Sequence, residues 1–367
     1  MDERTHREAL IAQLKDELGP SLARQFLALA DAAPIDDAAF RTAAFEYFDR
    51  HAAAKTNPDT YFNWIGQVAL PRPETPLANT GLWEWALSIA HEWEESRSAH
   101  QHKGSGYYFA GMRSIALGDI DRGFLYMHQA AVEDTYPDRD RLPESPAGWF
   151  IALDASRADQ AYHDWVSNHE VYLSGKLSAY RTAGRGALTL DELRSRYKTN
   201  GSLTDAATTL AHVIARLTRM ESSKRLRILD NRFAALLLTQ VALELCLAIE
   251  DVMHDRIVTG LALGGLASQF PQGHGISLTS DDVGRLNALA STPSGFDTVI
   301  TELLFGGVVT GFGRTLTDRE ADLEIAVLVR NKSAHGLDRP EAAARLFDQI
   351  TPRLFFALFM AIETLYP

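Results

Sequence analysis

The sequence has little that would tie it to an oxidising or a membrane environment. Its single cysteine, Cys246, excludes an internal disulfide and agrees with a reducing compartment. Residues 1–8 contain no apolar segment of the kind that signal peptides carry. Residues 257–280 lack Asp, Glu, Lys and Arg, but a proline and several glycines make them a poor membrane span. We therefore expect a cytoplasmic protein that makes no contact with a membrane.

The sequence also lacks an excess of positive charge. Its formal net charge of −12 argues against nonspecific electrostatic binding of nucleic acid by the protein as a whole. Residues 216–232 differ, because they contain six basic and two acidic residues. This segment can be a phosphate-facing patch or simply a solvated helix turn, and both interpretations stay open. Its basic residues are Arg216, Arg219, Lys224, Arg225, Arg227 and Arg232.

Apolar residues recur at helical spacing through most of the 367 residues, and the N-terminal half shows no strand-like alternation. We expect an all-α protein with a boundary near residue 199, which gives two domains, 1–199 and 200–367. Residues 56–80, with four prolines, are predicted to be irregular. Residues 259–275 are predicted to be a connector or a short helix. The main predicted helices cover residues 1–55 with a break at Gly19-Pro20, then 81–100, 203–220, 230–257, 296–305, and a last segment ending near Leu365.

Residues 104–134 carry a pattern typical of two closely packed antiparallel helices. Small residues such as Gly111 and Gly123 alternate with large ones such as Tyr107 and Phe124 across a turn at Gly118-Asp119. This segment resembles a tetratricopeptide-type helical hairpin. The resemblance implies that the N-terminal domain is a sensor or a docking surface for a protein partner or trigger.

The segment from Thr317 to Gly336 is predicted to form one helix. Acidic residues occupy its first turn, and a glycine suited to a left-handed cap follows its end. On an ideal wheel, Arg330 lies on the same stripe as Leu323 and Val327, where a guanidinium needs a partner or a task.

At the end of this helix, His335 lies about 140° from Arg330 on the wheel, and Asn331 lies one turn before His335. We expect Arg330 and His335 to reach one groove from its two walls. Lys332 and Ser333 are expected to face solvent.

The run Arg330-Asn331-Lys332-Ser333-Ala334-His335 resembles the motif of the HEPN family. Four residues separate the Arg from the His, a polar residue follows the Arg directly, and the motif ends a helix in a helical bundle. The resemblance covers roughly residues 200–367 and implies a four- to five-helix bundle.

Members of this family are commonly metal-independent endoribonucleases that act as dimers, and many are bacterial defence or toxin effectors. The resemblance therefore implies RNA as the substrate, structured RNA such as tRNA included, with no cofactor and no metal. Arg330 would stabilise the phosphorane, His335 would move protons and Asn331 would orient His335 or a phosphate oxygen. The residues proposed to hold RNA are Arg216, Arg219, Lys224, Arg225, Arg227 and Lys332.

Other interpretations of the same residues stay open. Arg330 can instead pair with a buried acid while His335 caps the helix, which would leave a non-catalytic scaffold or a nucleotide- or protein-binding module. His163-Asp164 and His254-Asp255 are His-Asp pairs of the kind that bind metal in phosphohydrolases. Such a site needs further His and Asp ligands at matching positions, and the sequence does not show them. The pair His100 and His102 lies in a polar turn and is expected to be solvated.

Overall fold

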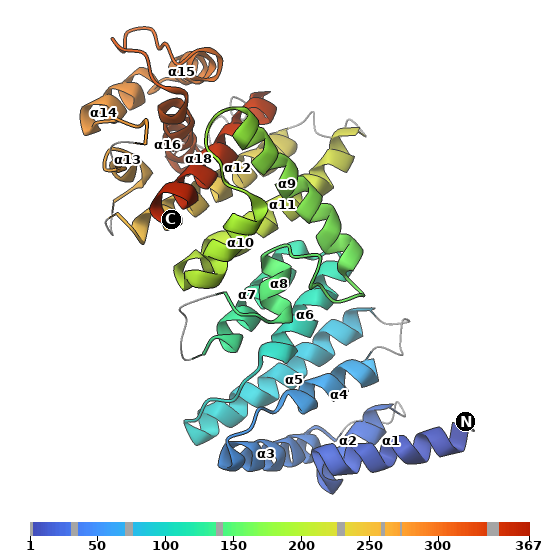
Figure 1. Ribbon diagram of the computed structural model, residues 1–367. Coiled ribbons are helices and arrows are strands. Elements are labelled where there is room, and N and C mark those ends of the chain that lie inside the picture. The colour runs from blue at the N-terminus through green and yellow to red at the C-terminus, as the bar shows by residue number, and fades with distance from the viewer. Residues whose placement is uncertain are drawn as a thin grey trace. The chain divides into compact units, whose positions relative to one another are not determined.

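The computed structural model describes residues 3–30, 36–69, 76–136, 142–225, 232–257, 261–271, 274–335 and 345–367 (Figure 1). Every regular element in these ranges is a helix, so the predicted all-α class is confirmed. None of these described helices combines the length and the apolar character needed to cross a membrane. The chain forms two compact units, residues 1–138 and 139–367.

The first unit has an aromatic core. The side chain of Tyr61 lies among the rings of Phe26, Phe40, Phe48 and Phe62, with ring centroids 5.0 to 6.4 Å apart. Edge-to-face and tilted contacts of this kind stabilise a core beyond the burial of area alone. The helices of this unit are α1 (Glu3–Leu18), α2 (Pro20–Ala30), α3 (Asp37–Ala54), α4 (Asp59–Ala69), α5 (Pro76–Arg97), α6 (Gly104–Ala116) and α7 (Ile120–Asp134).

The prediction that residues 56–80 are irregular is wrong. Helix α4 occupies Asp59–Ala69, and α5 already begins at Pro76. The prolines do not interrupt either helix, because Pro58 precedes α4 and Pro76 is the first residue of α5, where the missing N–H costs nothing. The aromatic residues between the prolines bury the inner face of α4 in the core.

The helical hairpin predicted for residues 104–134 is present as α6 and α7. Gly118 has a φ of +86° and ends α6, and the Asp119 side chain then accepts a hydrogen bond from the Arg122 amide at the start of α7. The two helices approach closely: a Cβ placed on Gly123 would lie 2.3 Å from Ile115, and one on Gly111 would lie 2.9 Å from the Gly123 carbonyl oxygen. Only glycine fits this crossing.

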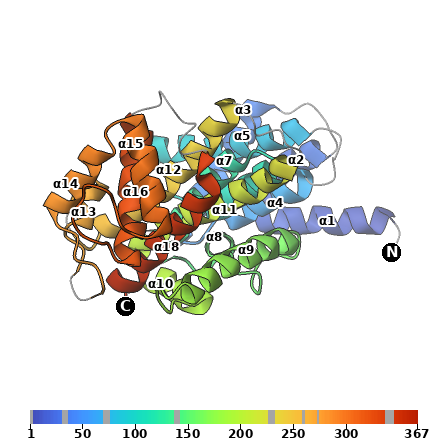
Figure 2. The same cartoon turned by 90° about the horizontal axis from the view of Figure 1, so that it is seen from above.

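The second unit is a helical bundle in which α12 packs against α11, α16 and α18, α16 packs against α18, and α9 packs against α11 and α18 (Figures 1 and 2). Helices α9 and α10 belong to this unit, although they precede the boundary that was predicted near residue 199. The helices of this unit are α8 (Pro146–Ile151), α9 (His163–Thr182), α10 (Leu190–Thr199), α11 (Thr204–Arg225), α12 (Arg232–His254), α13 (Leu263–Ala267), α14 (Ser280–Leu289), α15 (Pro293–Phe305), α16 (Asp318–His335) and α18 (Phe347–Leu365), with a 3-10 turn at Gly201–Leu203.

Helix α16 is enclosed by its neighbours. Residues 320–329 are all buried, and α12, α13, α15 and α18 surround them. Three of these buried residues are acids: Glu320, Asp322 and Glu324. Arg314 bonds Glu320, and Asp322 is held by Arg185 and Arg353. The buried centre of α16 fixes the position of its C-terminal end, where the motif lies.

Candidate functional site

The N-terminus of α16 is closed by a capping box. The Thr317 hydroxyl accepts from the Glu320 amide at 3.2 Å, and the Glu320 carboxylate accepts from the Thr317 amide at 2.8 Å. This reciprocal pair satisfies two donors that would otherwise lack partners at the start of the helix. The helix then runs to His335, as predicted, so Arg330 and His335 belong to one continuous helix. Gly336, the predicted cap residue, lies outside the described residues.

Arg330 points to helix α12. Its Nε donates to Oε2 of Glu250 at 2.9 Å, and its Nη2 donates to Oε1 at 3.3 Å. The two side chains are 19% and 11% exposed, respectively. The bidentate geometry matches the planar fork of the guanidinium to both carboxylate oxygens. The partner that Arg330 needs on an apolar stripe is therefore Glu250, and the pair reaches the surface at one edge.

The bidentate pair leaves part of the guanidinium available. An arginine side chain carries five N–H donors, and Glu250 takes one from Nε and one from Nη2. Among the residues that the structure describes, Nη1 has no hydrogen-bond partner. One Nη1 hydrogen and the remaining Nη2 hydrogen form a second fork at the end of the side chain. That fork has the spacing that a phosphate or a carboxylate accepts.

Asn331 and Lys332 bind the segment that contains α14. Asn331 Nδ2 donates to Oδ1 of Asn287 at 3.0 Å, and Lys332 Nζ donates to the carbonyl oxygen of Ser291 at 3.1 Å. Both contacts tie the end of α16 to its neighbour. The expectation that Ser333 faces solvent is wrong, because Ser333 is buried, whereas Lys332 is half-buried.

His335 is the last residue of α16, but its side chain lies outside the described part of the structure. The convergence of His335 with Arg330 on one groove therefore stays a prediction. The structure adds two residues to the site that the sequence analysis did not name, Glu250 and Asn287. Glu250 carried a signal: it is a charged residue one turn after the buried Cys246, on a helix that is mostly apolar. Nothing in the sequence distinguished Asn287.

The basic residues proposed to hold RNA are only partly described. Arg216 binds Glu244 and donates to Gln240 at 3.3 Å, so it joins α11 to α12. Arg219 is exposed on α11. The side chains of Lys224 and Arg225, together with the whole of Arg227, lie outside the described residues. Because Glu244 neutralises Arg216, the charge offered to a phosphate along α11 is smaller than the sequence implied.

The other histidines have structural partners. His163 lies 3.5 Å from the adjacent Asp164, and His254 contacts the carbonyl oxygen of Leu261. No group of three His, Cys, Asp or Glu side chains within the described ranges has the geometry to hold a metal ion.

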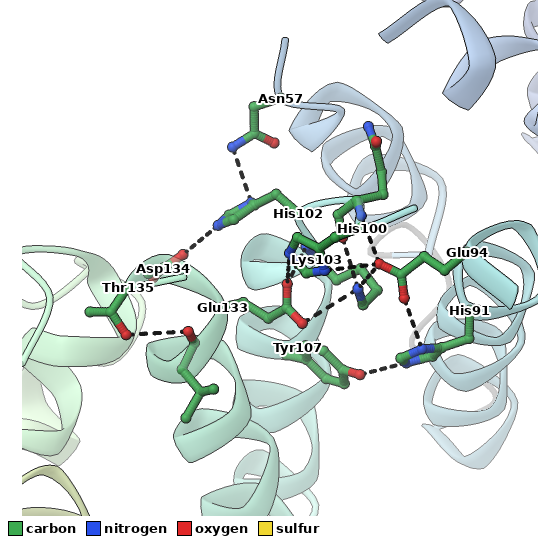
Figure 3. A network of polar contacts seen from close by, with 12 residues as sticks. Asn57, His91, Glu94, His100, His102, Lys103, Tyr107, Glu133, Asp134 and Thr135 are labelled. Atoms are coloured by element: carbon green, nitrogen blue, oxygen red, sulfur yellow. Dashed lines mark hydrogen bonds and ion pairs between the residues drawn. The ribbon is translucent and has the colours of Figure 1, made fainter. Parts of the chain in front are cut away.

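The polar turn between α5 and α6 is solvated only in part: His100 is exposed, as expected, but His102 is half-buried. Figure 3 shows His102 between Asn57 and Asp134, and Lys103 close to Glu94 and Glu133. The His102 Nε2 lies 3.0 Å from Asp134, and the Lys103 Nζ lies 2.5 Å from Glu94. The turn is the polar core of the first unit, because these contacts join it to α4, α5 and α7.

No family model matches the sequence, no curated protein matches it and no solved structure matches it.

Proposed function

We propose that the C-terminal bundle is a metal-independent endoribonuclease of the HEPN kind that acts as a dimer. The observation that carries the proposal is the state of Arg330. Its guanidinium stands at the edge of a buried helix, fixed by Glu250 on one side, with a second fork of donors unclaimed by the described residues. A guanidinium fixed in this way needs no rearrangement to bind charge that develops on a phosphate.

The reaction would use the RNA's own nucleophile. The 2′-oxygen attacks the adjacent phosphorus and gives its proton to solvent water, while the bond to the 5′-oxygen breaks. Arg330 stabilises the negative charge of the phosphorane, and His335, charged at a helix C-terminus, protonates the leaving 5′-oxygen. The products are a 2′,3′-cyclic phosphate and a 5′-hydroxyl. Glu250 and the Asn331–Asn287 pair hold the end of α16 in place for this chemistry.

A second function is favoured by the same ion pair. A carboxylate that neutralises Arg330 also fits a scaffold in which the pair joins α12 to α16 and no reaction occurs. In that case Glu250 and Arg330 specify how the two helices pack, and the bundle binds a protein or a nucleotide. The two functions differ in what happens when each partner is replaced.

The experiment compares cleavage of labelled structured RNA in EDTA by the wild-type protein and three variants. We expect Arg330→Ala and His335→Ala to lower the rate by about 10²- to 10⁴-fold. Arg345→Ala is the matched control, because it removes an Arg–Asp pair from the same unit without touching Arg330 or the residues proposed to hold RNA. Its rate should stay within about twofold of the wild type. Equal cleavage by all four proteins, or cleavage by none of them, would contradict the nuclease and support the non-catalytic scaffold.

Because replacing Arg330 leaves Glu250 buried without a partner, folding needs its own control. The double variant Glu250→Gln/Arg330→Met removes both charges at once. A double variant that is folded by circular dichroism and inactive on RNA supports the nuclease, and one that is folded and active contradicts it. The end group of the product gives a further test, since the proposed chemistry requires a cyclic phosphate.

A further inference from the structure

The end of α15 and the loop that follows it expose apolar side chains. Phe305, the last residue of α15, is 72% exposed and is the most exposed large apolar residue in the described ranges. Val308, three residues later, is 61% exposed. The segment from Leu303 to Gly313 contains no charged residue. Two large apolar side chains this exposed on one uncharged segment are typical of a contact surface.

Hydrogen bonds close the loop at residues 306–313. The Glu302 carboxylate accepts from the Thr310 amide at 2.9 Å and from its hydroxyl at 2.7 Å, and the Leu316 amide donates to the Gly307 carbonyl oxygen at 2.9 Å. Gly307 has a φ of +65°, and a Cβ on it would lie 2.6 Å from the Leu316 carbonyl oxygen, so only glycine fits there. Because the loop is already closed, Phe305 can bind a partner at a small cost in conformational entropy.

A guanidinium lies beside the same loop. Arg285 is exposed on α14, and its guanidinium carbon lies 5.5 Å from the centre of the Phe312 ring. This cation–π contact orients the guanidinium. Arg314, 5.6 Å from the same ring, is neutralised by two carboxylates. Arg285 differs, because none of the described carboxylates forms an ion pair with it, including that of Asp281 one turn earlier on α14.

Helix α14 connects this loop to the motif at the end of α16. Asn287, two residues after Arg285, accepts a hydrogen bond from Asn331 at 3.0 Å. On the loop side, a Cβ placed on Gly313 would lie 3.5 Å from Nη2 of Arg285. Helix α15 packs against both α14 and α16 (Figure 1). The loop, the Arg285 guanidinium and the motif therefore belong to one continuous region of the second unit.

An exposed aromatic ring next to an unneutralised guanidinium suits single-stranded nucleic acid. Unpaired bases stack on aromatic side chains, and arginine donates to the phosphates between them. A duplex keeps the faces of its bases stacked on one another, so a ring such as Phe305 selects nucleotides that are unpaired. The absence of acidic residues from Leu303 to Gly313 lets a polyanion approach this ring without repulsion.

We propose that Phe305 and Arg285 form a binding surface for the unpaired nucleotides of an RNA strand. This RNA surface, defined by those two residues, rests on the proposed function and narrows its substrate to RNA with an unpaired segment. A base stacks on the Phe305 ring, and the Arg285 guanidinium binds a phosphate of the same strand. The strand then continues over α14 to the motif.

The test measures the binding of an RNA that cannot be cleaved. A fluorescent single strand of about 12 nucleotides carries 2′-O-methyl groups, which remove the nucleophile, and fluorescence anisotropy gives its affinity for the full-length protein. We expect Phe305→Leu to raise the dissociation constant about fivefold or more, because leucine keeps an apolar contact but does not stack. Phe305→Trp should bind as tightly as the wild type.

The charge is tested separately. Arg285→Gln should also raise the dissociation constant about fivefold, and it should reduce the slope of its logarithm against the logarithm of the salt concentration by about 0.7, the value for one phosphate contact on a single strand. Val171→Ala is the matched control, because Val171 is 69% exposed on α9 of the same unit and lies outside the RNA surface. It should leave both quantities unchanged. Circular dichroism checks the fold of each variant, and if one misfolds, the other carries the test.

Each outcome decides the proposal. A wild-type protein that does not bind the oligonucleotide overturns it, and so does Phe305→Leu with unchanged affinity. Vesicles of phosphatidylcholine and phosphatidylserine are tested alongside: vesicle binding that is lost in Phe305→Leu while RNA binding is kept assigns the loop to a lipid surface and also overturns it. Weaker RNA binding by the variants of a protein that cleaves no RNA removes the nuclease and keeps the RNA surface. Cleavage by a wild type whose variants bind and cleave equally well does the reverse.

Discussion

Replacing His102 by glutamine removes a half-buried cation from the polar core of the first unit. His102 lies on the turn before α6, between Asp59 at 3.3 Å and Asp134 at 3.0 Å (Figure 3). Burial opposes the charged imidazolium, but the hydrogen bonds to Asp134 and Asp59 outweigh it and raise the pKa of His102 to about 9. The ring is therefore charged at neutral pH and joins α4 to α7.

The size of the effect follows from that pKa. A rise from 6.5 to about 9 corresponds to about 3 kcal/mol, at about 1.4 kcal/mol per unit. Because the side chain is 24% exposed, solvent screening reduces this contribution to about 1–2 kcal/mol. A group with a raised pKa binds more protons in the folded state. Its contribution is complete below pH 6.5 and is lost as the pH rises through 9.

The assay is urea unfolding followed by tryptophan fluorescence. Four of the six tryptophans, Trp64, Trp83, Trp85 and Trp93, lie in the first unit, so the signal reports mainly on that unit. We expect His102→Gln to lower the free energy of unfolding at pH 6, and this loss to shrink by about 1–2 kcal/mol between pH 6.5 and pH 9.5. His163→Gln is the control, because His163 lies on the surface beside Asp164.

A loss of stability that is the same at pH 6 and at pH 9.5 would refute the reasoning, since the charged ring would then contribute nothing. A His163→Gln variant with the same pH profile would refute it as well, because the profile would then not report the pair of aspartates.

Three further predictions concern groups that the proposed reaction does not use. Both carboxylate oxygens of Glu324 are buried without a hydrogen-bond partner in the described structure, and burial raises its pKa well above 4.5. The wild type should therefore lose stability relative to Glu324→Gln as the pH rises above 4.5, and a flat difference in urea unfolding would contradict this. Gly123→Ala should destabilise by about 1–3 kcal/mol because its Cβ would meet Ile115, whereas Gly175→Ala, with open space around it, should stabilise by about 0.4–1 kcal/mol. Thermal unfolding of the two variants tests this, and equal shifts in their unfolding temperatures would be inconsistent with the close α6–α7 crossing. The Cys246 thiol is buried and burial raises its pKa, so a thiol reagent should modify it only after unfolding; rapid reaction of the folded protein would show that α12 opens.

The predicted elements succeed where the signal is local. The glycine spacing in residues 104–134 predicted the α6–α7 hairpin, because a close helix crossing can be made only where side chains are absent. The break at Gly19-Pro20 separates α1 from α2 for an equally local reason. Helix α4 was missed because the prediction used the number of prolines and not their positions. Proline disrupts the interior of a helix but is tolerated in its first turn.

The acids of α16 show the limit of local reasoning. Asp318 to Glu324 read as an acid-rich helix start, but Glu320, Asp322 and Glu324 are buried. Their partners come from distant segments, since Arg185 and Arg353 hold Asp322. A sequence window does not contain these partners, so neither the burial nor the pairing was visible in it.

The sequence alone determined that the chain is helical, that α16 is one helix from its acidic start to His335, and that Arg330 lies on its apolar stripe. These follow from spacing, because helical periodicity fixes which residues share a face. Only the tertiary structure decided that Glu250, 80 residues away, binds one edge of that guanidinium and that Asn287 accepts a hydrogen bond from Asn331. Such pairings depend on which helices become neighbours, and packing of the whole bundle sets that choice.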